Sequence, residues 1–323
     1  MATTVPSRIP PRMSKRIAIL FAGQGAQAVG MGKDLAAKYP SAERLFAEAD
    51  RVLARPLSAV TFEGPEAELV KTVNCQPALY VHGLACLAAL REEAGEIKPH
   101  MAAGLSLGEF TAHAAAGTFA FSDGLKLVAE RGRLMQQACE QTTGAMAAMI
   151  GGEEAAVRQL ASDCGVDVAN FNSPGQIVLS GSVDAIDQAV AAAKDKGIRK
   201  AARLNVAGAY HSRLMQSAAD AFGPVLATPP MQAPKFPVVA NVTARPVNSP
   251  SDIREALARQ VTGSVRWTET IEFLVDVEKV ELFVELGPGG IIAGLVRRTR
   301  KEVPVLSVTD CPSVAAAAGQ LQS

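Results

Sequence analysis

The chain has 323 residues, of which 48% are hydrophobic and 20% are charged, a composition typical of a soluble globular protein. Its 32 Lys and Arg residues balance its 32 Asp and Glu residues, so no net field attracts the chain to nucleic acid or to a membrane surface. No hydrophobic run reaches the length of a membrane span, and residues 1–14 lack the apolar stretch of a secretory signal. We therefore expect a cytoplasmic protein with a disordered leader at residues 1–14.

The first half of the chain alternates short apolar runs with helical patterns. Residues 16–21 and 100–105 predict strands that end in glycine-containing turns. Apolar residues recurring every three to four positions predict helices at 31–54, with a break near Pro40, and at 76–94, 106–116 and 122–139. Ser122 and Asp123 are expected to cap the last of these helices.

Residues 144–206 follow a different pattern. Strands are predicted at 144–150, 166–170, 176–180 and 199–206, with helices at 153–164 and 183–196. This β-α-β-β-α-β order is typical of a ferredoxin-like lobe. We expect this small lobe to be inserted into a larger one.

The remainder predicts helices near 213–225, 251–261 and 268–277, strands at 236–240 and 280–285, and a helix from residue 289. Strands that alternate with helices indicate a mostly parallel sheet covered on both faces. The predicted fold class is therefore α/β. Residues 15–143 and 207–323 would form a large α/β-hydrolase-like lobe around the inserted lobe at 144–206.

The five cysteines are scattered along the chain and show no spacing typical of a zinc site. An odd number of scattered cysteines favours buried free thiols in a reducing compartment. No metal site is predicted.

A serine framed by glycines carries the strongest chemical signal. In "GLSLG" at residues 104–108, Ser106 lies between Gly104 and Gly108, where a predicted strand turns into a predicted helix. This G-x-S-x-G pattern predicts a nucleophile elbow, in which the serine hydroxyl stands at a helix N-terminus. A turn with a capping serine is the plainer interpretation, although the strand before and the helix after favour catalysis.

A serine nucleophile needs a base, which is usually a histidine. Of the four histidines, His82 lies in a long apolar run and His100 in a solvated turn. His113 would stand two helical turns from Ser106, roughly 10 Å along the axis and too far for a hydrogen bond. His211 lies in a glycine-containing loop before a helix. Elimination therefore selects His211, with an ordinary surface-loop histidine as the alternative.

Several motifs together resemble one enzyme family. In chain order they are "FAGQGAQ" (21–27), "QPAL" (76–79), "GLSLGEF" (104–110), "RGRLM" (131–135), "GAMAAMIG" (144–151), "NFNSPGQIVLSG" (170–181), "AYHS" (209–212) and "ELGPGG" (285–290). In combination they resemble the malonyl-CoA:acyl carrier protein transacylases. These enzymes load acyl carrier protein with malonyl groups, the extender units of fatty acid synthesis. The resemblance extends from about residue 15 to residue 309.

The resemblance implies roles for particular residues. Ser106 would carry the malonyl group and His211 would act as its base. The backbone of Leu107 and the region of Gln24 would form the oxyanion hole, and Arg131 would bind the malonyl carboxylate with two parallel hydrogen bonds.

Further positions are implied by the same resemblance. The backbone carbonyl of Gln260 would orient His211, and Tyr210 would limit branching at the acyl α-carbon. Asn170 and Gln76 match polar positions near the site. Met135 matches a pocket position, although an ordinary core role fits it equally well. Arg133 lies two residues beyond Arg131 and so faces another side of the helix, and it is expected at the surface.

Malonyl-CoA and acyl carrier protein are the implied partners, and CoA enters as part of the substrate rather than as a cofactor. Two basic stretches could meet an acidic carrier protein or could be ordinary solvated faces. They comprise Lys194, Lys196, Arg199, Lys200 and Arg203, and then Arg297, Arg298, Arg300 and Lys301.

The chain departs from the family pattern at two positions. Leu105 stands where the family usually has a histidine before the nucleophile, so hydrogen bonding around the elbow is expected to differ. Gly290 stands where a lysine is common, so any contact of that lysine is absent or supplied elsewhere.

Three other functions fit parts of the sequence. "GQGAQA" loosely matches a dinucleotide-binding fingerprint, although residues 31–54 predict a helix where that fold needs a second strand. A serine esterase or thioesterase would use the same elbow but would not need Arg131. A catalytically silent scaffold that binds the carrier protein would not need both Ser106 and His211.

Overall fold

A six-stranded sheet forms the centre of the computed structural model, which describes residues 15–322. Its strands are β1 (Ile17–Phe21), β2 (Met101–Gly104), β7 (Val238–Ala240), β8 (Arg245–Val247), β9 (Leu282–Leu286) and β10 (Val305–Val308). They are arranged in the order β10-β9-β1-β2-β7-β8, and every pair is parallel except the β7–β8 pair at the edge. The predicted leader at residues 1–14 lies outside the described residues.

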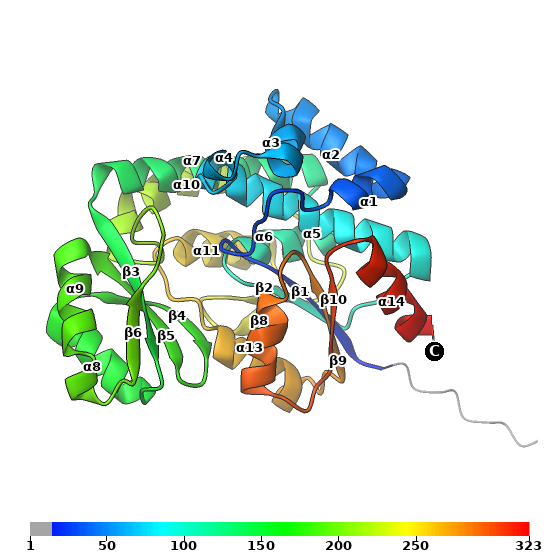
Figure 1. The fold of residues 1–323 in the computed structure, drawn as a ribbon. Coiled ribbons are helices and arrows are strands. Elements are labelled where there is room, and N and C mark those ends of the chain that lie inside the picture. Colours follow the sequence, from blue (N-terminus) through cyan, green and yellow to red (C-terminus); the bar gives the residue numbers. More distant parts are fainter. Residues whose placement is uncertain (1–14, 323) are drawn as a thin grey trace, which may run out of the picture.

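Helices surround this sheet (Figure 1). They are α1 (Lys33–Lys38), α2 (Pro40–Leu53), α3 (Leu57–Glu63), α4 (Glu66–Leu69), α5 (Thr72–Ala94), α6 (Leu107–Ala115), α7 (Phe121–Gln141), α10 (Gln216–Ala227), α11 (Pro250–Gln260), α12 (Trp267–Glu272), α13 (Ile291–Thr299) and α14 (Cys311–Gln322). Helix α6 packs on β1, β2 and β7, and α5 and α7 pack on α6. The middle strands are therefore buried, and residues such as Ile19 and Val284 have no exposed surface.

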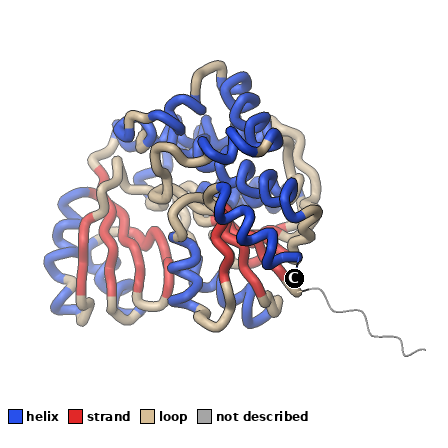
Figure 2. Tube along the Cα trace, turned by 45° about the vertical axis from the view of Figure 1, so that its right-hand side comes forward, coloured by secondary structure: helices blue, strands red, loops and turns tan. Residues whose placement is uncertain are grey.

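A second sheet lies beside the first (Figure 2). Its strands are β3 (Gly144–Ile150), β4 (Asp167–Ser173), β5 (Gln176–Ser182) and β6 (Lys200–Arg203), which pair antiparallel in the order β4-β5-β3-β6. Helices α8 (Glu154–Cys164) and α9 (Val183–Ala192) pack on it and enclose a separate hydrophobic cluster. We call these elements the small lobe and the rest of the described chain the large lobe.

The two sheets are connected through β4. Val265 of the large lobe donates its N–H to the Ala169 carbonyl and accepts the N–H of Phe171. Helices α12 and α13 also contact β4. These contacts place the small lobe beside the carboxyl ends of the parallel strands, where open α/β sheets bind their ligands.

The structure confirms the α/β fold class, with a mostly parallel sheet and a smaller antiparallel one, and it corrects several local predictions. Ser122 and Asp123 do not cap α7, because the helix begins one residue earlier and its N-cap is Ala120. The predicted helix at 268–277 is α-helical only in its first part, which is α12, and its second part, Phe273–Val277, is a π-helical segment. Elements α3, α4, β8, β10 and α14 were not predicted.

The five cysteines are free, with Cys75 and Cys86 buried and the other three half-buried rather than fully buried as predicted. Among residues 15–322, one helix, α5, is long and apolar enough to cross a membrane. However, 89% of its most apolar stretch is buried inside the protein, which identifies α5 as a core helix.

Candidate active site

Ser106 occupies a sharp turn between β2 and α6. It is the N-cap residue of α6 and has a φ of 54°, a conformation that costs energy for a residue with a side chain. A Cβ on Gly104 would lie 1.9 Å from the Gly108 carbonyl carbon, and a Cβ on Gly108 would lie 2.3 Å from the Phe21 carbonyl oxygen. Both framing residues must therefore be glycine. The Ser106 side chain makes no capping bond to α6, which leaves its hydroxyl available to other groups.

The Ser106 hydroxyl contacts His211. The distance from Oγ to Nε2 is 2.7 Å, and Nδ1 lies 2.9 Å from the Gln260 carbonyl and 3.2 Å from the Gly263 carbonyl. Because a carbonyl only accepts hydrogen bonds, Nδ1 must carry the proton in the neutral ring. Nε2 then has a free lone pair that accepts the serine hydroxyl.

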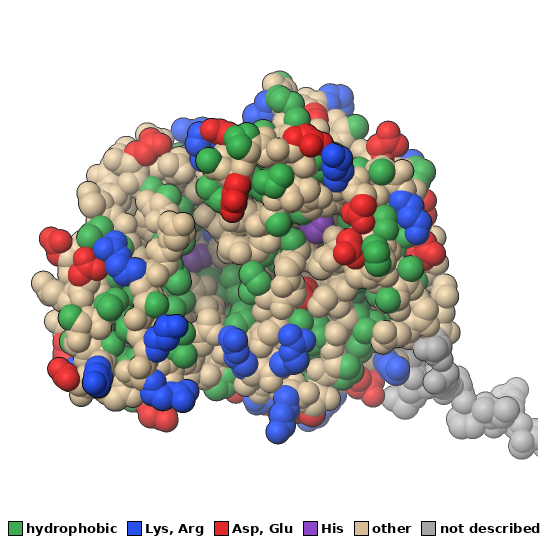
Figure 3. Space-filling model, in the orientation of Figure 1, with side chains coloured by type: hydrophobic (Ala, Val, Ile, Leu, Met, Phe, Trp, Pro, Cys, Tyr) green, Lys and Arg blue, Asp and Glu red, His purple; other side chains and the backbone are tan. Residues whose placement is uncertain are grey.

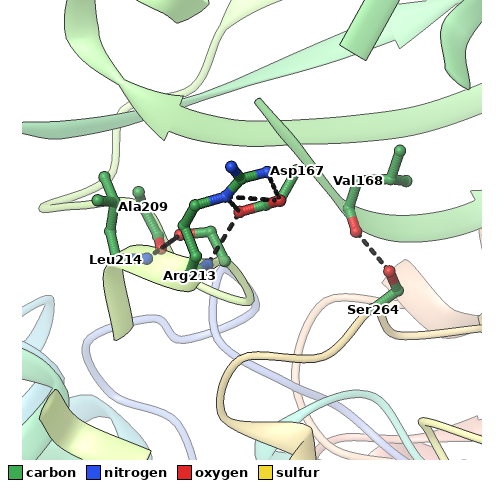
Figure 4. A network of polar contacts seen from close by, with 7 residues as sticks. Asp167, Val168, Ala209, Arg213, Leu214 and Ser264 are labelled. Atoms are coloured by element: carbon green, nitrogen blue, oxygen red, sulfur yellow. Dashed lines mark hydrogen bonds and ion pairs between the residues drawn. The ribbon is translucent and has the colours of Figure 1, made fainter. Parts of the chain in front are cut away.

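A compact turn holds His211, which also has a φ of 54°. The next residue, Ser212, donates its hydroxyl to the Ala209 carbonyl at 2.6 Å, and the Arg213 N–H donates to Asp167 of β4 at 2.9 Å. Figure 4 shows this network, including the ion pair between the Arg213 and Asp167 side chains. The small lobe thus anchors the turn that carries the histidine.

Burial keeps His211 neutral. Loss of solvent is the main cause that lowers its pKa to about 4, and the positive charge of Arg131 is the second cause. At neutral pH the Nε2 atom of the imidazole is therefore unprotonated and can accept a hydrogen bond.

Arg131 of α7 is 1% exposed and points at the same serine. Its Nη1 donates to Gln76 Oε1 at 2.7 Å, and its Nη2 donates to Gln260 Oε1 at 2.9 Å and to Ser106 Oγ at 3.1 Å. Burial lowers the Arg131 pKa to about 10, so the guanidinium remains charged. These partners are neutral, which leaves a buried cation whose hydrogen-bond donors converge beside Ser106.

A cavity of about 550 Å³ opens over these groups. It is lined by the remaining predicted site residues, which are Gln24, Leu107, Met135, Asn170 and Tyr210. Figure 3 shows the hollow between the two lobes, with hydrophobic side chains inside it. The cavity is thus lined by every predicted site residue except Gln260, which instead bonds to Arg131 and to His211.

Two lining residues have additional contacts. The Tyr210 hydroxyl is 2.8 Å from Thr72 Oγ1, which fixes its ring at the cavity wall. Gln76 Nε2 donates to Met135 Sδ at 3.5 Å, so Met135 is both buried and in contact with the polar site.

The other histidines lie away from the cavity. His82 is buried in α5, with Nε2 3.2 Å from the Thr309 carbonyl, and His113 is buried with Nδ1 3.1 Å from Thr118 Oγ1. His100 is half-exposed and lies 3.2 Å from Glu278. Across residues 15–322, no group of His, Cys, Asp and Glu side chains is arranged to hold a metal ion.

Sequence reasoning missed two residues of the site. Asn241, which follows β7, accepts the Ser106 N–H at 2.7 Å and donates to the Gly104 carbonyl at 2.7 Å, so it fixes the elbow from both sides. Glu109 is fully buried beneath the elbow. Its S-x-x-E spacing from Ser106 was a readable signal, because that spacing is typical of a helix capping box. Nothing in the sequence indicates that Asn241 reaches the elbow from 135 residues away.

The structure shows where both departures from the family pattern lie. Leu105 lines the cavity, while Asn241 and Gln260 make hydrogen bonds to the Ser106 backbone. Gly290 is the N-cap of α13 with a φ of 62°.

The two basic stretches are partly engaged within the protein. Lys196 pairs with Asp163 and Arg203 pairs with Asp187. Arg300 pairs with Asp276. Arg133 is exposed as predicted and pairs with Glu130.

A serine on a strand–turn–helix elbow, paired with a histidine in an α/β fold, is the arrangement of enzymes that form acyl-serine intermediates. Comparison with known proteins gives the same class, since residues 19–323 match the model of the acyl transferase domain. The malonyl CoA-acyl carrier protein transacylase of Bacillus subtilis is 40% identical over 303 residues, which cover 92% of this chain and 94% of that protein. The corresponding Escherichia coli K12 protein is 40% identical over 310 residues, 95% of this chain and 99% of that protein.

Solved structures agree with this assignment. The malonyl CoA-acyl carrier protein transacylase of Coxiella burnetii superposes with a TM-score of 0.92 at 35% identity, covering 96% of this chain and 99% of that one. A malonyl-transacylase solved in complex with its type II polyketide acyl-carrier protein superposes with a TM-score of 0.91 at 39% identity. The match covers 94% of this chain and 99% of that one. The chain therefore belongs to the acyl transferase family and, within it, to the malonyl CoA-acyl carrier protein transacylases.

Proposed function

We propose that this protein transfers a malonyl group from malonyl-CoA to the phosphopantetheine thiol of acyl carrier protein, and so supplies extender units for fatty acid synthesis. Transfer proceeds by a ping-pong mechanism through a malonyl ester of Ser106. The observation that carries this proposal is the 2.7 Å contact between Ser106 Oγ and the neutral Nε2 of His211, with Arg131 beside it.

In the first half-reaction, His211 Nε2 takes the hydroxyl proton while Ser106 Oγ attacks the thioester carbonyl carbon. The carbonyl electron pair moves onto oxygen. The N–H of Leu107, the first of α6, has no partner within its own helix and faces this oxyanion together with the Gln24 region. The oxyanion then collapses and the C–S bond breaks. His211 gives its proton to the departing sulfur, and CoA leaves as the free thiol.

The second half-reaction runs the same steps in reverse order. The carrier thiol gives its proton to His211 and attacks the ester carbonyl. Ser106 Oγ then leaves as its bond to the acyl carbon breaks, and it recovers the proton from His211. The Gln260 carbonyl supports both steps, because it stabilises the imidazolium that forms after each proton transfer.

Arg131 supplies the preference for malonyl groups. A guanidinium holds a carboxylate with two parallel hydrogen bonds, and a dry site strengthens them. Tyr210, fixed by Thr72, closes the cavity next to His211 and limits branching at the α-carbon. The reaction needs no cofactor beyond the CoA thioester itself, and it takes place in the cytoplasm.

The alternative is an esterase or thioesterase, in which water replaces the carrier thiol. Arg131 favours transfer of a carboxylated acyl group, because a simple esterase has no use for a buried cation at this position. The experiment is isotope exchange: the enzyme is mixed with malonyl-CoA and labelled CoA, without carrier protein.

A ping-pong acyl-enzyme will move label into malonyl-CoA, and His211→Ala will slow this exchange. Hydrolysis to malonate without exchange would support an esterase. Absence of exchange, together with normal transfer once carrier protein is added, would contradict the ping-pong mechanism.

A further inference from the structure

A buried carboxyl group lies directly beneath the proposed carboxylate-binding site. Glu109, on the first turn of α6, has no exposed surface. Its Oε2 accepts the Asn241 N–H at 3.0 Å and Gln260 Nε2 at 2.6 Å. Its Oε1 is buried and has no hydrogen-bond partner within the described residues. Glu109 thus takes no part in a capping bond to Ser106, despite its capping-box spacing.

Glu109 connects to Arg131 through one side chain. Gln260 Nε2 donates to Glu109 Oε2, and Gln260 Oε1 accepts Arg131 Nη2 at 2.9 Å. The orientation of the Gln260 amide is therefore fixed by Glu109 on one side, and this orientation presents an acceptor to Arg131 on the other. The same amide nitrogen donates to the Ser106 carbonyl at 2.9 Å, which includes the nucleophile turn in the network.

The charges in this network conflict once an acyl carboxylate enters. Without substrate, Arg131 is the only cationic group among residues 15–322 that acts on Glu109, and the two charges partly offset each other. A malonyl carboxylate on Arg131 adds a second negative charge close to Glu109, and both of these side chains are buried. Two carboxylates that share one buried cation favour protonation of one of them.

Resting on the proposed function, we propose that Glu109 is a positioning residue that couples selection of a carboxylate-bearing acyl group to uptake of one proton. When the acyl carboxylate binds Arg131, a proton from solvent binds the Glu109 carboxylate. No other bond changes in this step. When the acyl group leaves, the proton returns to solvent.

The surroundings of Glu109 support this linkage. Burial raises its pKa to about 7, against the lowering effects of Asn241, Gln260 and Arg131. The nearby histidines do not compete for the proton, because burial lowers the pKa of His113 to about 3 and that of His211 to about 4. Glu109 is thus the group of this network that titrates near neutral pH. The malonyl carboxylate, with an ordinary pKa, stays ionised throughout that range.

The experiment measures the ratio of kcat/KM for malonyl-CoA to kcat/KM for acetyl-CoA between pH 6 and pH 8.5. Acetyl groups carry no carboxylate, so the ratio cancels titration of His211 and of the CoA thiol. In the wild type we expect the ratio to fall on the order of tenfold as pH rises, the size of an ordinary coupling between two sites. Glu109→Gln keeps an acceptor for Asn241 and Gln260 but loses the charge, and its ratio will stay near the wild-type low-pH value throughout.

Glu130→Gln is the matched control, because it removes the same charge from the half-buried neighbour of Arg131 on α7, which pairs with Arg133. It will keep the wild-type pH dependence. If Glu109→Gln instead lowered the ratio equally at every pH and kept the wild-type slope, Glu109 would be merely structural. A wild-type ratio that does not change with pH would also overturn the proposal.

A second measurement needs no variant. Calorimetry of acyl-enzyme formation, in buffers of different ionisation enthalpy at pH 7.5, counts the protons taken up. We expect malonyl loading to take up a larger fraction of one proton than acetyl loading, and equal uptake would contradict the proposal. Failure of the proposed function is distinguishable, because the wild type would then either form no malonyl ester or pass the malonyl group to water instead of to carrier protein.

Discussion

Replacement of Arg131 by alanine tests how the site selects its acyl group. Arg131 is buried, and its two terminal nitrogens bond to Gln76, Gln260 and Ser106. When a carboxylate binds, Arg131 would replace its hydrogen bonds to the neutral amides of Gln76 and Gln260 with hydrogen bonds to a negatively charged group. In Arg131→Ala, the carboxylate enters the same cavity without its cationic partner.

The magnitude follows from the burial of the site. Removal of one member of a buried ion pair costs about 3–5 kcal/mol, and each 1.4 kcal/mol corresponds to a factor of about ten. Arg131→Ala should therefore reduce kcat/KM for malonyl-CoA by roughly 100- to 4,000-fold. Acetyl-CoA has no carboxylate to desolvate, so its kcat/KM should hold or rise. Arg131→Lys keeps the charge but loses the paired donors, and should give an intermediate loss.

The assay compares the ratio of kcat/KM for malonyl-CoA to kcat/KM for acetyl-CoA in the wild type and in these variants. Arg133→Ala is the matched control, because Arg133 lies two residues further along α7, is exposed and pairs with Glu130. Its ratio should match that of the wild type. An unchanged ratio in Arg131→Ala would refute the reasoning, since another residue would then bind the carboxylate.

Three further predictions concern the base, acid stability and branching. His211→Ala should lose about 10²- to 10⁴-fold in kcat/KM, whereas His113→Gln should keep most activity if it folds; the reverse order would contradict the assignment of the base. Unfolding monitored by urea should show stability falling as pH drops from 6.5 towards 4. His82, His113 and His211, with pKa values lowered to about 4, 3 and 4, bind protons there only when unfolded, while Glu109, with its pKa raised to about 7, opposes them by one proton. The unfolded chain therefore binds about two more protons than the folded protein, and the free energy of unfolding should change by about 2–3 kcal/mol per pH unit. A free energy of unfolding that does not change with pH would exclude burial of these histidines in the neutral form. Tyr210→Ala should raise kcat/KM for methylmalonyl-CoA relative to malonyl-CoA, and an unchanged preference would show that the Tyr210 ring does not limit branching.

Sequence reasoning reached those parts of the site that local patterns encode. The glycine frame of Ser106 determines a turn of five residues, and the surrounding strand and helix follow from local hydrophobic periodicity. The small lobe could also be predicted from local patterns, because its strands and helices follow one another along the chain.

Contacts between distant segments could not be read in this way. Asn241 meets Ser106 only because β7 pairs with β2, and no local pattern reports that pairing. Asp167 meets Arg213 only after the small lobe folds against the large one. Strand β10 and helix α14 were missed because their short or alanine-rich sequences carry weak periodicity, and contacts with β9 and α5 stabilise them in the fold.

Intact mass spectrometry tests the central claim most directly. The wild-type protein is incubated with malonyl-CoA, and acyl carrier protein bearing its phosphopantetheine arm is then added. We predict one malonyl adduct, which maps to the peptide containing Ser106 and moves to the carrier protein in the second step. Ser106→Ala should show no adduct. An adduct that persists in Ser106→Ala, or that maps to another residue, would contradict transfer through Ser106.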